Sequence, residues 1–360
     1  MSRARTFADL ASAYSGGALG KRNMIINGNM AVAQRGTSAT GLGTAEEYAT
    51  LDRMRISKGS TTAGRVTMTQ TADGPSGIAN CLKLACTTAD TSIDAGENLR
   101  IVYVIEGQDL QRLKKGTSDA EAITLSFYVK GNTSATYVCE LYDLDNTRHI
   151  AKTFAVTTSW NRIELTFAGD TTGALDDDTA GSMQITFWLH AGSTYTGGTL
   201  PSSWASASNA NKAGGLSTSF YDATSRTFFL TGLQMEVGEV ATPYKHESYG
   251  DNLFRCQRYY WQFGTGDPQY TPIGTGVSEG SFSNIDIFYP TKMRATPTIA
   301  YSGIQVFDGS TAEDVTGTRG SSAGLQSIHF QPNHGSLVVG RGVHAYLTGT
   351  SGYFSFDSEL

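Results

Sequence analysis

Strict alternation of apolar and polar residues is the feature that most restricts how this 360-residue chain can fold. The alternating apolar positions form three clear series: Ile123, Leu125, Phe127 and Val129; Ile163, Leu165 and Phe167; and Met183, Ile185, Phe187 and Leu189. A period of two places each series on one face of a β-strand, and the Gly, Asn and Asp residues that bound them are typical of turns. The pattern therefore predicts an all-β protein built on a sandwich or barrel, and no long period of self-similarity supports a β-helix or a propeller.

Composition supports a folded β-protein and excludes several functional classes. The chain has 41 glycines and only 17% charged residues, while 39% hydrophobic residues are enough to build cores. The net charge of −6, without a Lys/Arg-rich run, argues against a nucleic-acid binder. No apolar stretch approaches the ~20 residues of a membrane span, and the N-terminus lacks the apolar core of a signal peptide. We therefore expect synthesis in a cytosol, no membrane insertion and no nucleic-acid partner.

Breaks in the strand pattern divide the chain into four segments. Pro243 stops the strand that ends near Val237, and Asp251 is placed to cap a short helix whose Leu253, Cys256 and Tyr260 share a face. The predicted segments are an N-terminal attachment helix with its linker (1–22), a jelly-roll domain (23–242), a helical hinge (243–257) and a smaller C-terminal β-sandwich domain (258–360).

The N-terminal helix is predicted from an apolar stripe at Phe7, Leu10 and Tyr14, followed by the flexible sequence SGGALG. A stripe this short is not stable by itself, so it needs either copies of itself or a docking surface. We expect residues 1–20 to serve assembly.

Several sequence pieces together resemble tail-fibre and related minor structural proteins of tailed bacteriophages. They are RNMIINGNMAVAQRGTS (22–38), TSWNRIELTF (158–167), LTGLQMEVGEVATPYKHESYGDNLFRCQRYY (230–260), FYPTKMRATPTI (288–299) and the terminal DSEL. The segment 23–242 is similar to the jelly-roll sandwiches of carbohydrate-binding modules, whose last strand often leads into a Q-x-E-x-G turn such as Gln234–Gly238. Where family members often carry Asp-Arg-Trp, this chain has Asp52-Arg53-Met54.

Trp204 and Tyr195 are the candidate ligand-binding residues. Both lie in the 190–220 insert, and Trp204 is surrounded by Ser, Asn and Ala without apolar neighbours in sequence. An aromatic ring among small polar residues suits stacking on a sugar face. The alternative is that Trp204 anchors the insert to its own domain or to a neighbouring subunit. Trp160 and Trp188 lie in strands, so we expect them to pack in the core or on a sheet face.

No sequence motif indicates catalysis, a cofactor or a metal. Glu140, Asp143, Asp145 and Glu164 are interpreted as surface charges, because nothing in the sequence brings two of them together as glycoside hydrolysis requires. The run Asp176–Asp178 is interpreted as a solvated turn, with a Ca²⁺ loop as the alternative. His329 and His334 lie five apart across a Pro-Asn turn and give no fixed metal geometry. The four cysteines, Cys81, Cys86, Cys139 and Cys256, are expected to be buried free thiols.

These observations and the resemblance predict a non-enzymatic virion protein that presents a host-receptor surface, with a cell-surface glycan as the expected ligand. Its expected partners are other copies of itself in a homotrimer and tail or capsid proteins bound through residues 1–20. The main alternative is a purely architectural virion protein, and a glycan depolymerase is a third hypothesis.

Overall fold

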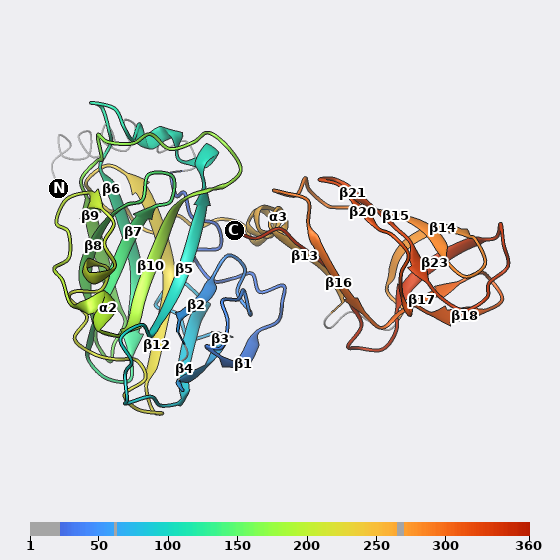
Figure 1. Ribbon diagram of the computed structural model, residues 1–360, viewed down its shortest axis with the longest axis horizontal. Coiled ribbons are helices and arrows are strands. Elements are labelled where there is room, and N and C mark those ends of the chain that lie inside the picture. Colours follow the sequence, from blue (N-terminus) through green and yellow to red (C-terminus); the bar gives the residue numbers. More distant parts are fainter. Residues whose placement is uncertain (1–21, 61–62, 265–269) are drawn as a thin grey trace. The chain divides into compact units, whose positions relative to one another are not determined.

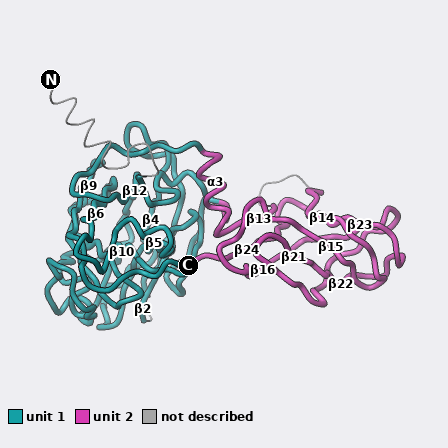
Figure 2. Tube along the Cα trace, turned by 90° about the horizontal axis from the view of Figure 1, so that it is seen from above, with its two compact units in different colours: residues 1–33, 37–248, 360 teal, residues 34–36, 249–359 magenta. Residues whose placement is uncertain are grey.

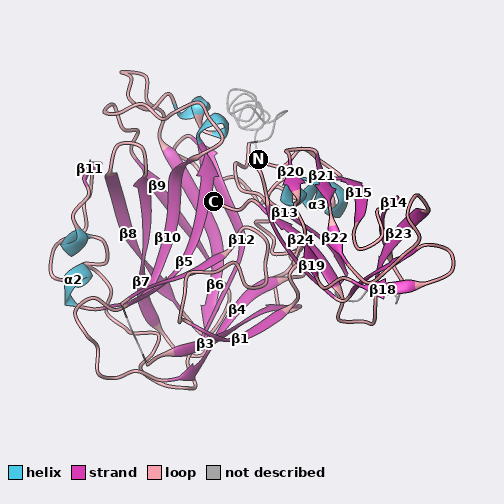
Figure 3. Cartoon of the chain, turned by 45° about the vertical axis from the view of Figure 1, so that its right-hand side comes forward, coloured by secondary structure: helices cyan, strands magenta, loops and turns pink. Residues whose placement is uncertain are grey.

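The computed structural model describes residues 22–60, 63–264 and 270–360, and it confirms an all-β protein with few, short helices (Figure 3). The N-terminal helix predicted within 1–22 falls in residues 1–21, outside the described residues. The chain divides into two compact units, the first holding residues up to 33, 37–248 and 360, and the second holding 34–36 and 249–359 (Figure 2). The division at 248/249 lies inside the segment predicted as a hinge.

The first unit is a sandwich of two antiparallel six-stranded sheets (Figure 1). Sheet I contains, in spatial order, β1 (Ser38–Leu42), β3 (Arg65–Thr71), β4 (Cys81–Thr88), β12 (Thr227–Val237), β6 (Ile123–Gly131) and β9 (Asn161–Phe167). Sheet II contains β11 (Ala205–Ser206), β8 (Arg148–Val156), β7 (Ala135–Asp143), β10 (Gly181–Ala191), β5 (Asn98–Glu106) and β2 (Arg55–Gly59). Sequence neighbours are split between the two sheets, as expected of a jelly roll rather than a simple meander.

The core of this sandwich consists of the alternating residues found in the sequence. Phe127 of sheet I meets Phe154 and Phe187 of sheet II edge-to-face, with ring centroids 5.3 and 5.0 Å apart. Aromatic pairs in this geometry add to the burial of apolar area that stabilises the sandwich. The alternation that predicts strands therefore also selects which side of each strand faces the core.

Short helices lie in the loops of the first unit. They are η1 (Gly107–Asp109), η2 (Gln111–Leu113), α2 (Ser193–Thr196) and η3 (Asn209–Asn211). The last two belong to the 190–220 insert, which follows β10 and carries α2 beside the β7–β8 side of sheet II (Figures 1 and 3).

The second unit begins with helix α3 (Tyr249–Gln257), which is shorter than the predicted hinge 243–257. Asp251 lies in the first helical turn, not at the cap, and Ser248, a favoured capping residue type, precedes the helix. Cys256 is buried, as the predicted helical face requires, but Tyr260 lies beyond the helix at the start of a strand, so its predicted place on that face is wrong. Among the described residues, no helix is long and apolar enough to cross a membrane.

The strands of the second unit form three sheets around their own core. The three-stranded sheet is β13 (Tyr260–Gly264), β24 (Tyr353–Asp357) and β16 (Thr298–Ser302), and the two-stranded sheet is β19 (Gly317–Thr318) and β22 (Pro332–Asn333). The seven-stranded sheet is β18 (Ala312–Asp314), β17 (Ile304–Phe307), β23 (Gly342–Leu347), β14 (Pro272–Ser278), β15 (Ser283–Phe288), β21 (Ser327–Phe330) and β20 (Ser322–Ala323). Phe330 and Phe354, 4.7 Å apart, lie in the core that joins these sheets.

Candidate functional site

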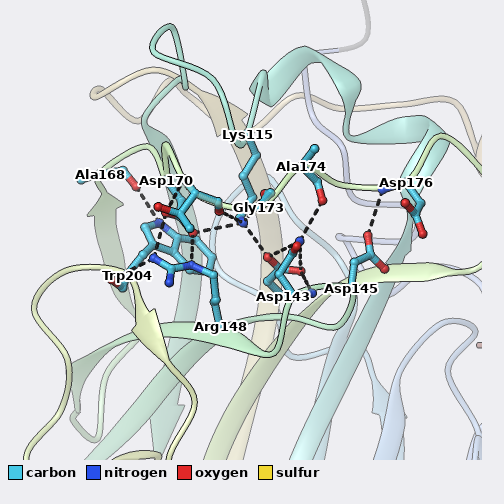
Figure 4. Close-up of polar contacts among 12 residues, drawn as sticks. Lys115, Asp143, Asp145, Arg148, Ala168, Asp170, Gly173, Ala174, Asp176 and Trp204 are labelled. Carbon is cyan, nitrogen blue, oxygen red and sulfur yellow. Dashed lines mark hydrogen bonds and ion pairs between the residues drawn. The ribbon is translucent and has the colours of Figure 1, made fainter.

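Trp204 is part of the protein core, so the structure favours the anchoring alternative for this residue. Its side chain is 9% exposed, and its indole Nε1 donates to the main-chain oxygen of Ala168 at 2.8 Å (Figure 4). The ammonium of Lys115 lies 5.4 Å from the ring centroid. A ring held this way has little free face for a sugar. Trp204 and Tyr195 belong to different apolar clusters, so the structure does not bring the two predicted contacts together.

A buried ion network lies beside Trp204 (Figure 4). Lys115 Nζ is 2.5 Å from Asp143 Oδ2 and 3.0 Å from Asp170 Oδ2, and it donates to the main-chain oxygens of Thr172 (2.9 Å) and Gly173 (2.8 Å). The guanidinium of Arg148 binds Asp170 at 2.7 and 3.0 Å. Although burial acts to raise the pKa of Asp170, its bonds to Arg148 and Lys115 outweigh burial, and the pKa is lowered. The network fixes the loops around Trp204 and leaves Lys115 no donor for a ligand.

The interpretation of the carboxylates as surface charges is wrong for two of them. Asp143 and Glu140 are 0% and 1% exposed, whereas Asp145 and Glu164 are exposed as predicted. The reason is local: each buried carboxylate has partners supplied by other strands or loops, which the sequence does not place. A buried carboxylate without such partners would be strongly destabilising.

The outer face of sheet II carries a row of polar and aromatic side chains. On β10 the residues Phe187 and Leu189 point into the sandwich, so Trp188 points outward. Strand pairing aligns Trp188 with Arg100 on β5 and with Val138 on β7. The next row aligns Thr186 with Glu140, and neighbouring strands in a sheet are ~4.8 Å apart. These side chains therefore form one continuous layer on the outer side of the sheet, and Trp188, Glu140 and Thr186 are buried within it.

Glu140 is the centre of this surface. Its Oε1 pairs with His149 Nδ1 at 2.8 Å, and its Oε2 accepts a hydrogen bond from Trp188 Nε1 at 2.8 Å. The guanidinium of Arg100 lies 5.1 Å from the Trp188 ring and bonds Asn98 and Ser57. Glu140 thus orients the indole and the imidazole but has no oxygen left over for catalysis.

The 190–220 insert folds across part of this surface and adds two side chains. Tyr195 of α2 lies with its ring 5.1 Å from Trp188, and Lys212, just after η3, places its ammonium 4.9 Å from the ring of Tyr142. Hydrogen bonds from Ala213 N to Tyr195 O (2.9 Å) and from Gly198 N to Ala210 O (2.8 Å) hold the two halves of the insert together. A Cβ at Gly198 would lie 2.9 Å from the main-chain oxygen of Ala210, so a larger residue would force the backbone of the insert to shift. We call the surface made by Arg100, Glu140, Tyr142, Trp188, Tyr195 and Lys212 the cationic face.

Some polar groups at and beside the cationic face have no hydrogen-bond partner among the described residues. Among the described residues, the Lys212 ammonium makes neither a hydrogen bond nor an ion pair, and it lies over the ring of Tyr142. Beside this face, His149 Nε2 and Arg55 Nε are buried without a hydrogen bond, whereas Lys212 is only partly buried. Burial lowers the pKa of Lys212; Glu140 opposes this shift and Arg100 adds to it. Buried polar groups without a hydrogen-bond partner are uncommon in native proteins.

Two other aromatic surfaces have several of their polar groups bonded within the chain. On sheet I, Trp160 donates to the main-chain oxygen of Asp73 at 3.0 Å, and Lys130 pairs with the Asp73 carboxylate at 2.8 Å. On the seven-stranded sheet of the second unit, Tyr346 bonds Gln305 at 3.0 Å. Sheet I also carries Lys83, whose ammonium lies 5.7 Å from the Phe229 ring centroid and has no ion pair or hydrogen bond among the described residues.

The remaining sequence candidates do not converge on a site. Asp176–Asp178 are all exposed, as in a solvated loop. His329 pairs with Asp286 and His334 with Ser283, each at 2.8 Å, so the two histidines have separate partners. Within the described residues, no group of three His, Cys, Asp or Glu side chains is arranged to hold a metal. All four cysteines are buried, and none of them forms a disulfide within the described residues.

Arg100 and Lys212 were not among the site residues predicted from the sequence. For Arg100 the sequence did contain an indication. Trp188 alternates with the core residues of β10, so its indole faces outward and must pack against side chains of neighbouring strands. Lys212 gave no signal, because its role depends on how the insert folds back over Tyr142.

Comparisons with known proteins identify no family. No family model and no curated protein matches this chain. Solved structures that match include a family 11 carbohydrate-binding module from Clostridium thermocellum in complex with a beta-1,3-1,4-mixed-linked tetrasaccharide (13% identity, 57% of this chain and 98% of that chain, TM-score 0.30). Another is TmCBM61 in complex with beta-1,4-galactotriose (11% identity, 60% and 99%, TM-score 0.30).

A third match is the enzymatically active domain of tailspike protein 4 from bacteriophage CBA120 (13% identity, TM-score 0.30). It covers 60% of this chain but only 21% of the tailspike chain. At these TM-scores the matches carry no argument about what this chain binds.

Proposed function

We propose that this protein is a non-catalytic virion adhesin that binds a host-surface glycan through the cationic face. The observation that supports the proposal is the combination on one sheet of partly buried aromatic rings with polar groups that lack partners. Glycan sites join apolar faces for the sugar ring with a few polar groups that fix its orientation. Tyr195 remains the proposed ring contact, and Trp204 is proposed only as the anchor of the insert.

Absence of catalysis is part of the proposal, and it rests on how the buried carboxylates are used. Glu140 is bound to His149 and Trp188, and Asp143 is bound to Lys115. Glycoside hydrolysis needs two carboxyl groups that both face the scissile bond. Neither of these carboxylates is free to act in this way.

Assembly is the second part of the proposal. Residues 1–20 attach the protein to a tail or capsid protein of the virion, and three copies associate, after synthesis in the host cytoplasm. A single aromatic contact is weak, so three copies would gain the avidity that holding a cell requires.

The test compares host-cell and glycan binding of the intact protein and of Tyr195→Ala. We expect a loss of roughly two- to tenfold in affinity per site, by analogy with aromatic pairs, with little change in melting temperature. Phe229→Ala on sheet I is the matched control, since Phe229 is a partly buried aromatic on the other sheet, and it should bind normally. Equal binding by both variants would contradict the assignment of the face.

The purely architectural hypothesis makes a different prediction. Such a protein would bind virion proteins and neither cells nor glycans. Binding of the purified full-length chain to tail or capsid proteins alone would favour that hypothesis over the adhesin.

A further inference from the structure

The outer face of the seven-stranded sheet in the second unit carries a row of aromatic side chains. On the neighbouring strands β17 and β23, the residues that alternate with core side chains are Gln305, Phe307, His344 and Tyr346 (Figure 1). Strand pairing sets Phe307 opposite His344, with ring centroids 5.2 Å apart, and the His344 ring is 5.5 Å from that of Tyr346. Tyr270, which precedes β14, extends the row, with its ring 5.4 Å from Tyr346. We call Tyr270, Tyr346, His344 and Phe307 the aromatic strip.

The backbone at Tyr270 is strained, although its side chain faces solvent. Its φ of 69° lies in the left-handed region, which is unusual for a bulky residue. The main chain is fixed there, because Tyr270 N donates to Leu347 O and Leu347 N donates to Thr271 O, each at 2.9 Å. Tyr270 is nevertheless 61% exposed, so burial of its ring does not compensate for the strain. Strained residues cluster at sites that contact ligands, and contact with a ligand would explain a strained, exposed ring.

Tyr346 is buried and supports the exposed part of the strip. Its hydroxyl donates to Gln305 Oε1 at 3.0 Å, and Gln305 Nε2 donates to Asp314 Oδ1 at 2.7 Å. Burial raises the pKa of Tyr346, and Tyr270 and Asp314 add to this shift, so the hydroxyl stays protonated and keeps donating. These hydrogen bonds fix the ring against which Tyr270 rests. A ligand would therefore meet Tyr270 and His344, which are exposed, rather than Tyr346.

The charges near the aromatic strip disfavour an anionic ligand. The seven strands of this sheet, all of them within the described residues, contain no lysine or arginine. Asp314 lies on β18 beside the strip, and Asp286, two strands away, pairs with His329 at 2.8 Å. Arg341, which precedes β23, is paired with Asp308 at 3.5 Å. An acidic ligand would meet carboxylates rather than cations on these strands.

A sugar chain fits the aromatic strip better than other ligands that pack on aromatic rings. Proteins that stack single-stranded nucleic acid combine their rings with a basic groove, which these strands do not provide. A Pro-rich peptide also packs on aromatic rings, but proline has no N–H to donate to the acceptors beside the strip. Sugar hydroxyls can donate to Asp314 and Gln305 while the apolar face of the sugar packs on a ring.

We infer that the aromatic strip is a second saccharide-binding surface and that it takes a neutral sugar chain. It lies on the second unit, whereas the cationic face lies on the first. The inference therefore goes beyond the proposed function and does not depend on the residues that carry it.

The experiment measures binding by calorimetry to the full-length Tyr195→Ala protein, in which the proposed contact on the cationic face is already removed. The neutral probes are tetrasaccharides of glucose, galactose and mannose. Tetragalacturonate, decaproline and a thymidine oligonucleotide represent the other ligand classes. We expect at least one neutral tetrasaccharide to bind and the three other probes not to bind.

Tyr270→Gly in the same background separates ligand contact from packing. Glycine adopts positive φ without strain, so the melting temperature should not fall. Affinity for the neutral sugar should fall by about two- to tenfold, as for loss of one aromatic contact, and His344→Ala should weaken it similarly. Phe288→Ala is the matched control, because Phe288 is 75% exposed on the outer face of the same sheet and has no ring contact among the described residues. It should leave sugar binding unchanged.

Several results would overturn the inference. Neutral sugars that bind the unaltered protein but not Tyr195→Ala would leave the proposed function standing and exclude a second site. The same conclusion about the strip would follow if no neutral sugar bound, or if Phe288→Ala weakened binding as much as Tyr270→Gly. Binding of decaproline or the oligonucleotide in place of sugars would assign the strip to another ligand. A marked fall in the melting temperature of Tyr270→Gly would show that the ring serves packing.

Discussion

Removing the Lys115 charge tests whether the buried ion network holds the loops of the first unit together. In Lys115→Met the side chain keeps its bulk but loses the ammonium that touches four oxygen atoms, two of them on carboxylates. Asp170 keeps Arg148, but Asp143 keeps only its hydrogen bonds from Asn146. The network, neutral before the change, then carries one uncompensated negative charge in a buried place.

Breaking a buried ion pair in this way costs about 3–5 kcal/mol. For a unit of this size each kcal/mol lowers the melting temperature by ~2–4 °C, so the expected fall is roughly 6–20 °C. The assay is thermal unfolding of the full-length protein followed by near-ultraviolet circular dichroism. Lys114→Met is the matched control, because the adjacent Lys114 is 53% exposed and pairs with Glu121 at the surface, and it should leave the transition unchanged. A fall below 2 °C in Lys115→Met would refute the reasoning.

A Ca²⁺ ion should partly replace the positive charge that is lost when Lys115 is changed to alanine. Two carboxylates and two main-chain carbonyls are the ligand types that Ca²⁺ prefers, and Lys115→Ala would leave them around an empty space. We expect millimolar Ca²⁺ to raise the melting temperature of Lys115→Ala but not that of the unaltered protein. The double variant Lys115→Ala/Asp143→Asn, with one carboxylate fewer, should respond less. No response in Lys115→Ala would mean that the oxygen atoms do not keep their arrangement without the lysine.

Three further predictions concern the same unit and the assembly. Burial lowers the pKa of His190 from 6.5 to about 4. Between these pH values the unfolded state binds more protons than the folded state, so stability falls as the pH falls, by up to about 3 kcal/mol. Denaturant titrations of His190→Gln should lack this dependence of stability on pH, and an unchanged dependence would contradict the assignment to His190. Trp204→Ala should lower the melting temperature by removing a buried ring, at a cost of about 3–5 kcal/mol, whereas a stable variant with impaired cell binding would restore Trp204 as a ligand contact. Light scattering of the full-length chain should show three copies, and a monomer at micromolar concentration would exclude the proposed homotrimer.

The fold class followed from the sequence because strand periodicity is local. The alternation at 123–129, 163–167 and 183–189 depends only on which residues must face a core, and each of these stretches lies in a strand whose predicted side is buried. The end of the last sandwich strand at Val237 was also predictable, since glycine and proline act on the backbone at their own positions. The bounds of helix α3 were predicted less well, because helix ends are determined by capping contacts that several nearby residues could make.

The candidate site could not be predicted in the same way, because it depends on which strands become neighbours. Residues 100, 140 and 188 are far apart in sequence, and only the pairing of β5, β7 and β10 places their side chains in adjacent rows. The same pairing buried Glu140, which looked like a surface charge in isolation, by giving it two hydrogen-bond partners.

Trp204 and Lys212 show most clearly what the sequence could not determine, since both lie in one polar insert with no periodicity. The sequence determined that the insert would be a loop, and composition made Trp204 its most conspicuous side chain. Only the tertiary structure decided that the indole turns inward to Ala168 while the ammonium lies over Tyr142 without a partner. A loop's local sequence constrains its backbone weakly, so the surface onto which it folds determines which of its side chains are buried and which remain available to a ligand.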